Sequence, residues 1–183
     1  MRLDKFTIKA QEALQDASQL ALKSEHPELG TLHLLAALLN QDGGLIAPLL
    51  QKISADPSRL KAAVMLDLDK LPQQRGGGEP NPSTDLRRVL AVVEDEAKKL
   101  KDEYVSTEHL LLAEQARVDG DRARTRVAID LERPEHVLRA RQVLEREELA
   151  GGGAQRHEAE RVRLVAEALV EAHRHVDPLV LGL

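Results

Sequence analysis

Apolar residues recur at three- and four-residue intervals along most of the first 113 positions, which predicts amphipathic helices. A long helix is predicted over residues 7–23, where alanines and leucines form one stripe that lets a neighbouring helix approach closely. A second long helix is predicted over 84–102. Shorter helices are predicted over 31–40 and 45–53, from Pro57 to before Pro72, and from Thr107. The pattern predicts an all-α fold.

Polar residues mark the predicted helix starts. Thr7, Thr31 and Asp56 each stand before a periodic segment, where a side-chain oxygen can accept a hydrogen bond from a first-turn N–H. Asp56 is followed by a proline, which is favoured at the first helical position because the N–H that it lacks would be unpaired there. Ser83 or Thr84 is expected to cap the second long helix in the same way.

One segment of the chain nearly recurs. Thr31–Leu39 (TLHLLAALL) returns 76 positions later, counted from residue 31 to residue 107, as Thr107–Ala113 (TEHLLLA). The period is too long for a solenoid unit, so the repetition predicts an internal duplication and a pseudo-two-fold helical domain. His33 and His109 occupy equivalent places inside apolar helices, and we expect each to make a structural hydrogen bond.

Composition divides the chain. Residues 73–82 (QQRGGGEPNP) combine three glycines with two prolines, which predicts a linker without regular structure. The linker separates a first repeat, 1–72, from a shorter second repeat, 83–113, in which the last two helices cannot be recognised. Residues 114–183 contain 12 Arg and no Lys, whereas the preceding part contains 5 Arg and 9 Lys. This Arg-rich tail has no predicted fold, and a shifted reading frame is one hypothesis for its origin.

Composition also narrows the functional classes. Aromatic residues make up only 1% and cysteine is absent, so the core is aliphatic, and disulfides and thiolate zinc sites are excluded. The net charge of −5 argues against a nucleic-acid partner, which needs clustered basic residues. No segment reaches the roughly 20 apolar residues of a membrane span, and the first nine residues lack the apolar run of a signal peptide. We therefore expect a soluble, cytoplasmic protein.

No catalytic, cofactor or metal site is expected. The three glycines at 76–78 lack the lysine and the flanking strand and helix of a phosphate-binding P-loop, so ATP hydrolysis by that mechanism is excluded. Nothing assembles a nucleophile, a base and an orienting residue. Loosely metal-like spacing occurs near the C-terminus without fixed partners, at His157, Glu160, His173, His175 and Asp177.

Several segments resemble the Clp repeat N-terminal domain of the AAA+ Clp unfoldases, and the bacterial ClpB disaggregase branch most of all. They are MRLDKFT (1–7), AQEAL (10–14), LLNQDGG (38–44), LPQ (71–73) and YVSTEHLLLA (104–113), so that the resemblance covers residues 1–113. It implies an all-helical double repeat without catalytic activity. Such a domain binds unfolded or aggregated protein and helps to deliver it to the ATPase rings, whose Walker motifs this chain lacks.

The resemblance also implies site residues. Positions that match those associated with substrate handling in ClpB-type domains are Thr7, Asp102 and Glu108, and a shallow apolar groove is expected near Leu90, Val92 and Leu110. The related ClpC-type domains recognise phosphoarginine with a Glu in the Thr-Glu-His motif of each repeat. Leu32 stands in that place in the first motif here, which favours the ClpB branch. From the residues alone, Thr7 is also explained as a helix cap, and Glu108 as a charge at the positive end of a helix.

Two alternatives stay open at this point. The first is an adaptor-binding N-domain of a Clp protease ATPase subunit, which would act through one specific partner. The second is a non-functional truncated product whose incomplete second repeat does not fold.

Overall fold

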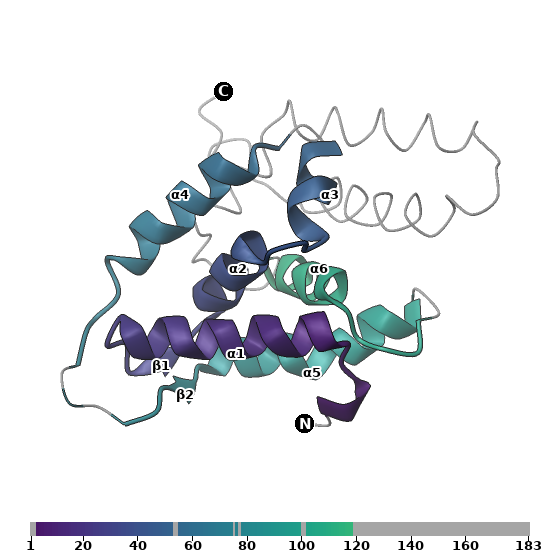
Figure 1. Ribbon diagram of the computed structural model, residues 1–183. Helices are drawn as coiled ribbons and strands as arrows, with labels where there is room; N and C mark the ends of the chain where they lie inside the picture. The colour runs from purple at the N-terminus through teal and green to yellow at the C-terminus, as the bar shows by residue number, and fades with distance from the viewer. Residues whose placement is uncertain (1–2, 53–54, 75, 77, 100–101, 119–183) are drawn as a thin grey trace, which may run out of the picture.

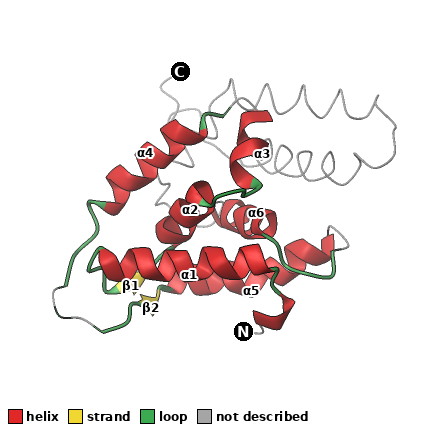
Figure 2. Ribbon diagram, viewed as in Figure 1, coloured by secondary structure: helices red, strands yellow, loops and turns green. Residues whose placement is uncertain are grey.

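The helices predicted from the apolar periodicity are present in the computed structural model, which describes residues 3–52, 55–74, 76, 78–99 and 102–118 (Figure 1, Figure 2). The all-α prediction is confirmed. In chain order the elements are η1 (Leu3–Lys5), α1 (Ile8–Lys23), β1 (Glu28–Leu29), α2 (Thr31–Asn40), α3 (Ile46–Lys52), α4 (Pro57–Leu68), β2 (Asn81–Pro82), α5 (Thr84–Lys99) and α6 (Thr107–Val118).

Three of the predicted helix caps are confirmed. In each, a side-chain oxygen accepts a hydrogen bond from a backbone N–H in the first turn, which would otherwise be unpaired. The pairs are Thr7 Oγ1 with the N–H of Ala10 (3.3 Å), Asp56 Oδ1 with that of Ser58 (2.9 Å) and Ser83 Oγ with that of Leu86 (3.1 Å).

The prediction that Thr31 caps α2 is wrong. Thr31 is the first helical residue, and the cap position belongs to Gly30. The N–H of Gly30 donates to Nδ1 of His33 at 3.0 Å. A side chain three residues beyond the cap can reach back to the cap N–H, as a Glu does in a capping box, and here a ring nitrogen replaces the carboxylate.

The core is organised around α2 and α6. Residues 33–39 of α2 and 107–113 of α6 are all buried. The two helices contact each other, and each contacts the long helix of both repeats. In Figure 1 they lie between α1 and α5 on one side and α3 and α4 on the other. A helix that is apolar on all sides is stable only when neighbours enclose it, so the outer helices are required for the central pair.

The alanine stripe of α1 faces this core. Ala10, Ala13, Ala17 and Ala21 are all fully buried, at 0% exposure. Because alanine adds only a methyl group, the backbone of α1 can lie close to α2, the helix with which it makes extensive contact.

Two short parallel pairings join the repeats reciprocally. β1 pairs with β2, with Leu29 opposite Pro82, and an isolated bridge pairs Phe6 with Val105. The offset of 76 residues makes Leu29 equivalent to Val105, and Phe6 equivalent to Pro82, in the two repeats. The two pairings are therefore the same contact formed twice. In each, the segment before the short helix of one repeat pairs with the segment before the long helix of the other. The pseudo-two-fold prediction is thereby confirmed.

The prediction that prolines exclude regular structure from the linker is wrong at its end, where β2 lies. The N–H of Asn81 donates to the carbonyl of Pro27 at 3.1 Å, and that of Ser83 donates to the carbonyl of Leu29 at 2.9 Å. Pro82 stands between these two donors. Alternate residues donate in such a ladder, so proline falls where no N–H is required.

Some expectations fall outside the described residues. They concern the Arg-rich tail beyond Val118, the helices missing from the second repeat, and the metal-like spacing near the C-terminus. Within the described part, no three His, Cys, Asp or Glu side chains are grouped so that they could hold a metal ion. In the same part of the chain, every helix is too short or too polar to cross a membrane.

Candidate functional site

Three of the predicted site residues converge around the pairing of Phe6 with Val105. The N–H of Thr7 donates to the carbonyl of Val105 at 2.8 Å. Asp102 lies three residues before Val105, and Glu108 lies three residues after it. The structure therefore brings Thr7, Asp102 and Glu108 to one end of the molecule, where α1 and α6 begin.

Thr7 has a clear structural role at this end. Its hydroxyl caps α1 through the N–H of Ala10, and its side chain is half-buried. The offset of 76 residues relates Thr7 to Ser83 and Ala10 to Leu86, and Ser83 caps α5 through Leu86. Since both repeats contain this cap, it is part of the shared scaffold and does not by itself indicate a binding role.

Asp102 lies against a buried ring. Its Oδ2 is 3.2 Å from Nε2 of His109, whose side chain is 0% exposed, whereas that of Asp102 is 29% exposed. Nδ1 of His109 accepts the N–H of Ser106 at 2.9 Å. A neutral ring that accepts at Nδ1 carries its proton on Nε2, the nitrogen facing the carboxylate. The ring thus holds Asp102 at the protein surface.

Ser106, His109 and Asp102 lie in the order of a hydrolase triad, with Oγ of Ser106 2.7 Å from Nδ1 of His109. The first repeat argues for a structural role instead. There the N–H of Gly30 donates to Nδ1 of His33 in the same way, and Gly30 has no hydroxyl. At the start of both α2 and α6, therefore, a histidine Nδ1 accepts the N–H of the residue that precedes the helix. The prediction of structural hydrogen bonds for both histidines is confirmed.

Glu108 is enclosed. It is the second residue of α6 and only 2% exposed, and the hydroxyl of Thr107 donates to its Oε2 at 3.3 Å. A carboxylate in the first turn faces the positive end of the helix dipole, which stabilises it by about 0.3–1 kcal/mol. In this conformation the carboxylate is part of the α6 N-terminus and not of the surface.

The three predicted groove residues do not gather around one groove. Leu110 is 0% exposed and belongs to the core. Leu90 packs partly buried against that core, while Val92 is 40% exposed. Residues two apart on a helix are rotated by about 200° around its axis, so Leu90 and Val92 face nearly opposite sides of α5.

Two exposed apolar residues at the same end were missed by the sequence analysis. Ile8, 75% exposed, follows Thr7, and Tyr104, 52% exposed, precedes Val105. Ile8 does not lie on the face of α1 that carries the alanine stripe, and this spacing was the signal in the sequence that its side chain is exposed. Large apolar side chains left in water beside a partly exposed carboxylate form a surface that can bind an extended apolar segment.

The comparison with protein families gives one match over most of the chain: a model of the Clp repeat (R) N-terminal domain matches residues 5–129. Similar curated proteins include the chaperone protein ClpB of Rhodopirellula baltica, 42% identical over 119 residues, and that of Pseudomonas putida, 41% identical over 114 residues. These stretches are 65% and 62% of this chain. The chain spans only 13% of the length of each relative.

Solved structures share the fold. The Hsp104 N-terminal domain from Candida albicans superposes with a TM-score of 0.60 and 20% identity, covering 88% of this chain and 89% of that one. The N-domain of ClpV from Vibrio cholerae gives a TM-score of 0.63 with 18% identity, covering 78% and 85%.

Proposed function

The chain belongs to the Clp repeat (R) N-terminal domain family, and on that premise we propose that it is the protein-binding module of a ClpB-type disaggregase chaperone. In this proposal it engages unfolded or aggregated polypeptide and passes it to AAA+ ATPase rings. The curated relatives are much longer than this chain, which fits a module that acts within, or together with, a larger protein.

The observation that carries the proposal is the exposed apolar pair Ile8 and Tyr104 at the start of α1 and before α6. Burying one such side chain in full contributes about 1.5–3 kcal/mol, and apolar burial gives affinity without requiring a particular sequence. That property suits a protein whose clients share exposed apolar segments and little else.

The predicted site residues enter the proposal with different roles. Asp102, partly exposed and held by His109, is proposed to contact the client directly. Thr7 and Glu108 are proposed to set the start of α1 and α6, and through them the positions of the residues around the pairing. Val92, 40% exposed on α5, is proposed as a separate apolar contact, while Leu90 and Leu110 are proposed to act only through the core in which they pack.

Binding of fluorescein-labelled casein, an unfolded protein, to the 183-residue chain tests the proposal. The double substitution of Ile8→Ser and Tyr104→Ser should weaken binding about ten-fold, because each change removes part of the apolar contact. Leu66→Ser is the matched control, since Leu66 on α4 is 55% exposed and lies on a different element. An equal loss in both variants, or none in either, would overturn the assigned surface.

The truncated-product alternative is separated by a urea titration of the same chain. A folded module should unfold in one cooperative transition. The absence of a transition would favour the non-functional product. Recovery of a single adaptor protein, with no casein binding, would favour the adaptor-binding alternative.

A further inference from the structure

The pairing of Phe6 with Val105 has an outer edge at Tyr104. In a parallel pair each residue directs its N–H and its carbonyl to the same edge of the strand, and the next residue directs both to the opposite edge. The N–H of Val105 donates to the carbonyl of Lys5 at 2.7 Å, and the carbonyl of Val105 accepts the N–H of Thr7 at 2.8 Å. The backbone groups of Tyr104 therefore point away from the pairing.

The other polar groups beside this pairing are bound within the chain. The carbonyl of Phe6, on the opposite strand, accepts Nε2 of Gln11 at 2.8 Å. The N–H of Ser106 donates to Nδ1 of His109 at 2.9 Å. Within the described part of the chain, by contrast, no backbone group pairs with the N–H or the carbonyl of Tyr104. Tyr104 thus offers one donor and one acceptor at the same edge.

Apolar side chains accompany this open edge. Tyr104 is 52% exposed, and Ile8, which follows the paired Thr7, is 75% exposed. An extended polypeptide presents its own N–H and carbonyl groups along its edge and its side chains alternately to the two faces. Such a chain can bind the backbone of Tyr104 and place an apolar side chain on the same surface.

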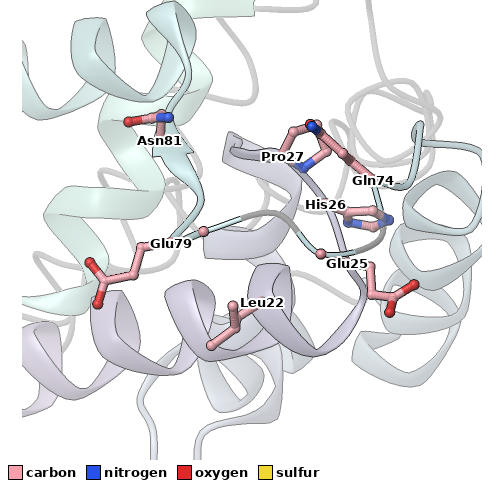
Figure 3. A pocket seen from close by; sticks show the side chains of 9 residues that line it. Leu22, Glu25, His26, Pro27, Gln74, Glu79 and Asn81 are labelled. Carbon is pink, nitrogen blue, oxygen red and sulfur yellow. The ribbon is translucent and has the colours of Figure 1, made fainter.

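The pairing of β1 with β2 provides an internal comparison. The carbonyls of Pro27 and Leu29 both accept N–H groups of the opposite segment, so Glu28, which lies between them, directs its backbone groups away from β2 as Tyr104 does in the second repeat. Figure 3 shows Pro27 and Asn81, which form one of these hydrogen bonds at 3.1 Å and also line a hollow of about 390 Å³. The two repeats therefore have equivalent edges.

The side chains at the two edges differ. The offset of 76 residues relates Tyr104 to Glu28, and Ile8 to Thr84, and both residues of the first repeat's edge are exposed and polar. A charged side chain on an exposed edge opposes the addition of a further strand. The edge in the first repeat is thus protected by a carboxylate, whereas the edge in the second repeat is accompanied by two apolar side chains.

We propose that an extended segment of the client adds a strand to the edge at Tyr104. The N–H of Tyr104 donates to a carbonyl of the client, and the carbonyl of Tyr104 accepts a client N–H. Apolar side chains of the client lie on the ring of Tyr104 and on Ile8. Since every polypeptide carries these backbone groups, the contact adds affinity without requiring a particular sequence. The proposal rests on the proposed function in one respect, namely that the occupant is an unfolded polypeptide.

Methylation of single amides in one peptide tests the strand addition with the full chain. The fluorescein-labelled peptide has ten residues and blocked ends, with serine and glycine around a central Leu-Val-Leu that fixes the register. Each variant carries one N-methyl group on a central amide, which removes a donor and leaves the side chains unchanged. Binding should weaken about ten-fold where the methyl group replaces the hydrogen that pairs with Tyr104, and less than two-fold at the amides on either side. Similar losses at adjacent amides, or no loss at any, would overturn the proposal.

Hydrogen exchange locates the contact on the protein. In the free chain the N–H of Tyr104 should exchange with water nearly as fast as an unstructured amide, and saturating peptide should slow it at least ten-fold. The N–H of Glu28 is the matched control, because it occupies the equivalent edge, and its rate should not change. Water-exchange nuclear magnetic resonance measures both amides. An unchanged rate at Tyr104 in the presence of bound peptide would overturn the proposal.

Casein binding keeps the two proposals apart. If casein binds and the double substitution of Ile8→Ser and Tyr104→Ser weakens it, but no single amide of the peptide is sensitive to methylation, the strand addition is wrong and the proposed function stands. If one peptide amide is sensitive and Tyr104 is protected, but casein does not bind, the proposed function fails and the edge is retained as a peptide-binding site.

Discussion

The carboxylate of Asp102 lies 3.2 Å from Nε2 of His109, at the place where the first repeat brings the ring of His26 to 2.8 Å from Nε2 of His33. The duplicated scaffold therefore holds a carboxylate beside its histidine at one end and a second imidazole at the other. The backbone cap made by the histidine Nδ1 is the same in both repeats. What differs is the chemistry that each end presents, which leads to separate expectations for the two.

Replacement of Asp102 by Asn should lower the free energy of unfolding by about 1 kcal/mol, because the charged carboxylate, 3.2 Å from Nε2 of His109, attracts the ring N–H more strongly than a neutral amide does. Urea denaturation at pH 7 measures the change. Glu103→Gln neutralises the adjacent exposed carboxylate and should change stability by less than about 0.5 kcal/mol. Equal effects of the two variants would contradict a specific role for Asp102.

The pH dependence of stability should include a contribution from His33. The unfolded chain protonates this ring near pH 6.5, whereas burial lowers its pKa in the folded protein to about 4. The stability contributed by the neutral ring is therefore complete above pH 6.5. It is lost as the pH falls towards 4, by up to about 3 kcal/mol.

His33→Gln provides the comparison for that expectation, because its amide oxygen can still accept the N–H of Gly30 but does not titrate. Urea denaturation of both proteins at several pH values between 4 and 7 should give a steeper loss for the wild type. Parallel curves would show that His33 does not take part.

The caps at Thr7 and Ser83 form a matched pair, since they occupy equivalent places in the two repeats. Thr7→Ala and Ser83→Ala should each lower the free energy of unfolding by about 1 kcal/mol. Only Thr7→Ala changes the end that is proposed to bind clients, so only it should weaken casein binding. Equal binding by the two variants would leave Thr7 with a structural role alone.

Glu25→Gly should stabilise the protein by about 1 kcal/mol, because glycine relieves the left-handed conformation at the end of α1. Glu25→Ala removes the same carboxylate, with any contact that it makes, without relieving the strain, so Glu25→Gly should melt at a higher temperature than Glu25→Ala. Thermal unfolding followed by circular dichroism distinguishes the two. A lower melting temperature for Glu25→Gly would show that the carboxylate contributes more to folding than its conformation costs.

The helices of this fold were predictable because their information is local. The alanine stripe of α1 and the caps Asp56 and Ser83 each act within a few residues, and the structure confirms them. The cap of α2 was not predictable by the same rules. They assign caps to hydroxyl or carboxylate side chains, whereas here the imidazole of His33 accepts the N–H of Gly30.

The pairings between the repeats escaped prediction for a different reason. The partners Leu29 and Pro82 are distant in the sequence, and strands of two residues leave no alternating pattern. The offset of 76 residues nevertheless contained the answer, since it relates Leu29 and Pro82 to Val105 and Phe6. Side-chain exposure was only partly predictable: the register of α1 separates Ile8 from the buried alanine stripe, but nothing local indicates that Glu108 is enclosed.

The reciprocal pairing has a consequence for synthesis. The residues that precede α1 leave the ribosome first, but their partner, Val105, follows about 100 residues later. At common translation rates the interval lasts roughly 5 to 20 s. During that time the newly made first repeat lacks this pairing with the second, and until residue 82 is made it lacks the pairing of β1 with β2 as well. A protein proposed to capture unfolded chains therefore passes through a period in which it is such a chain itself.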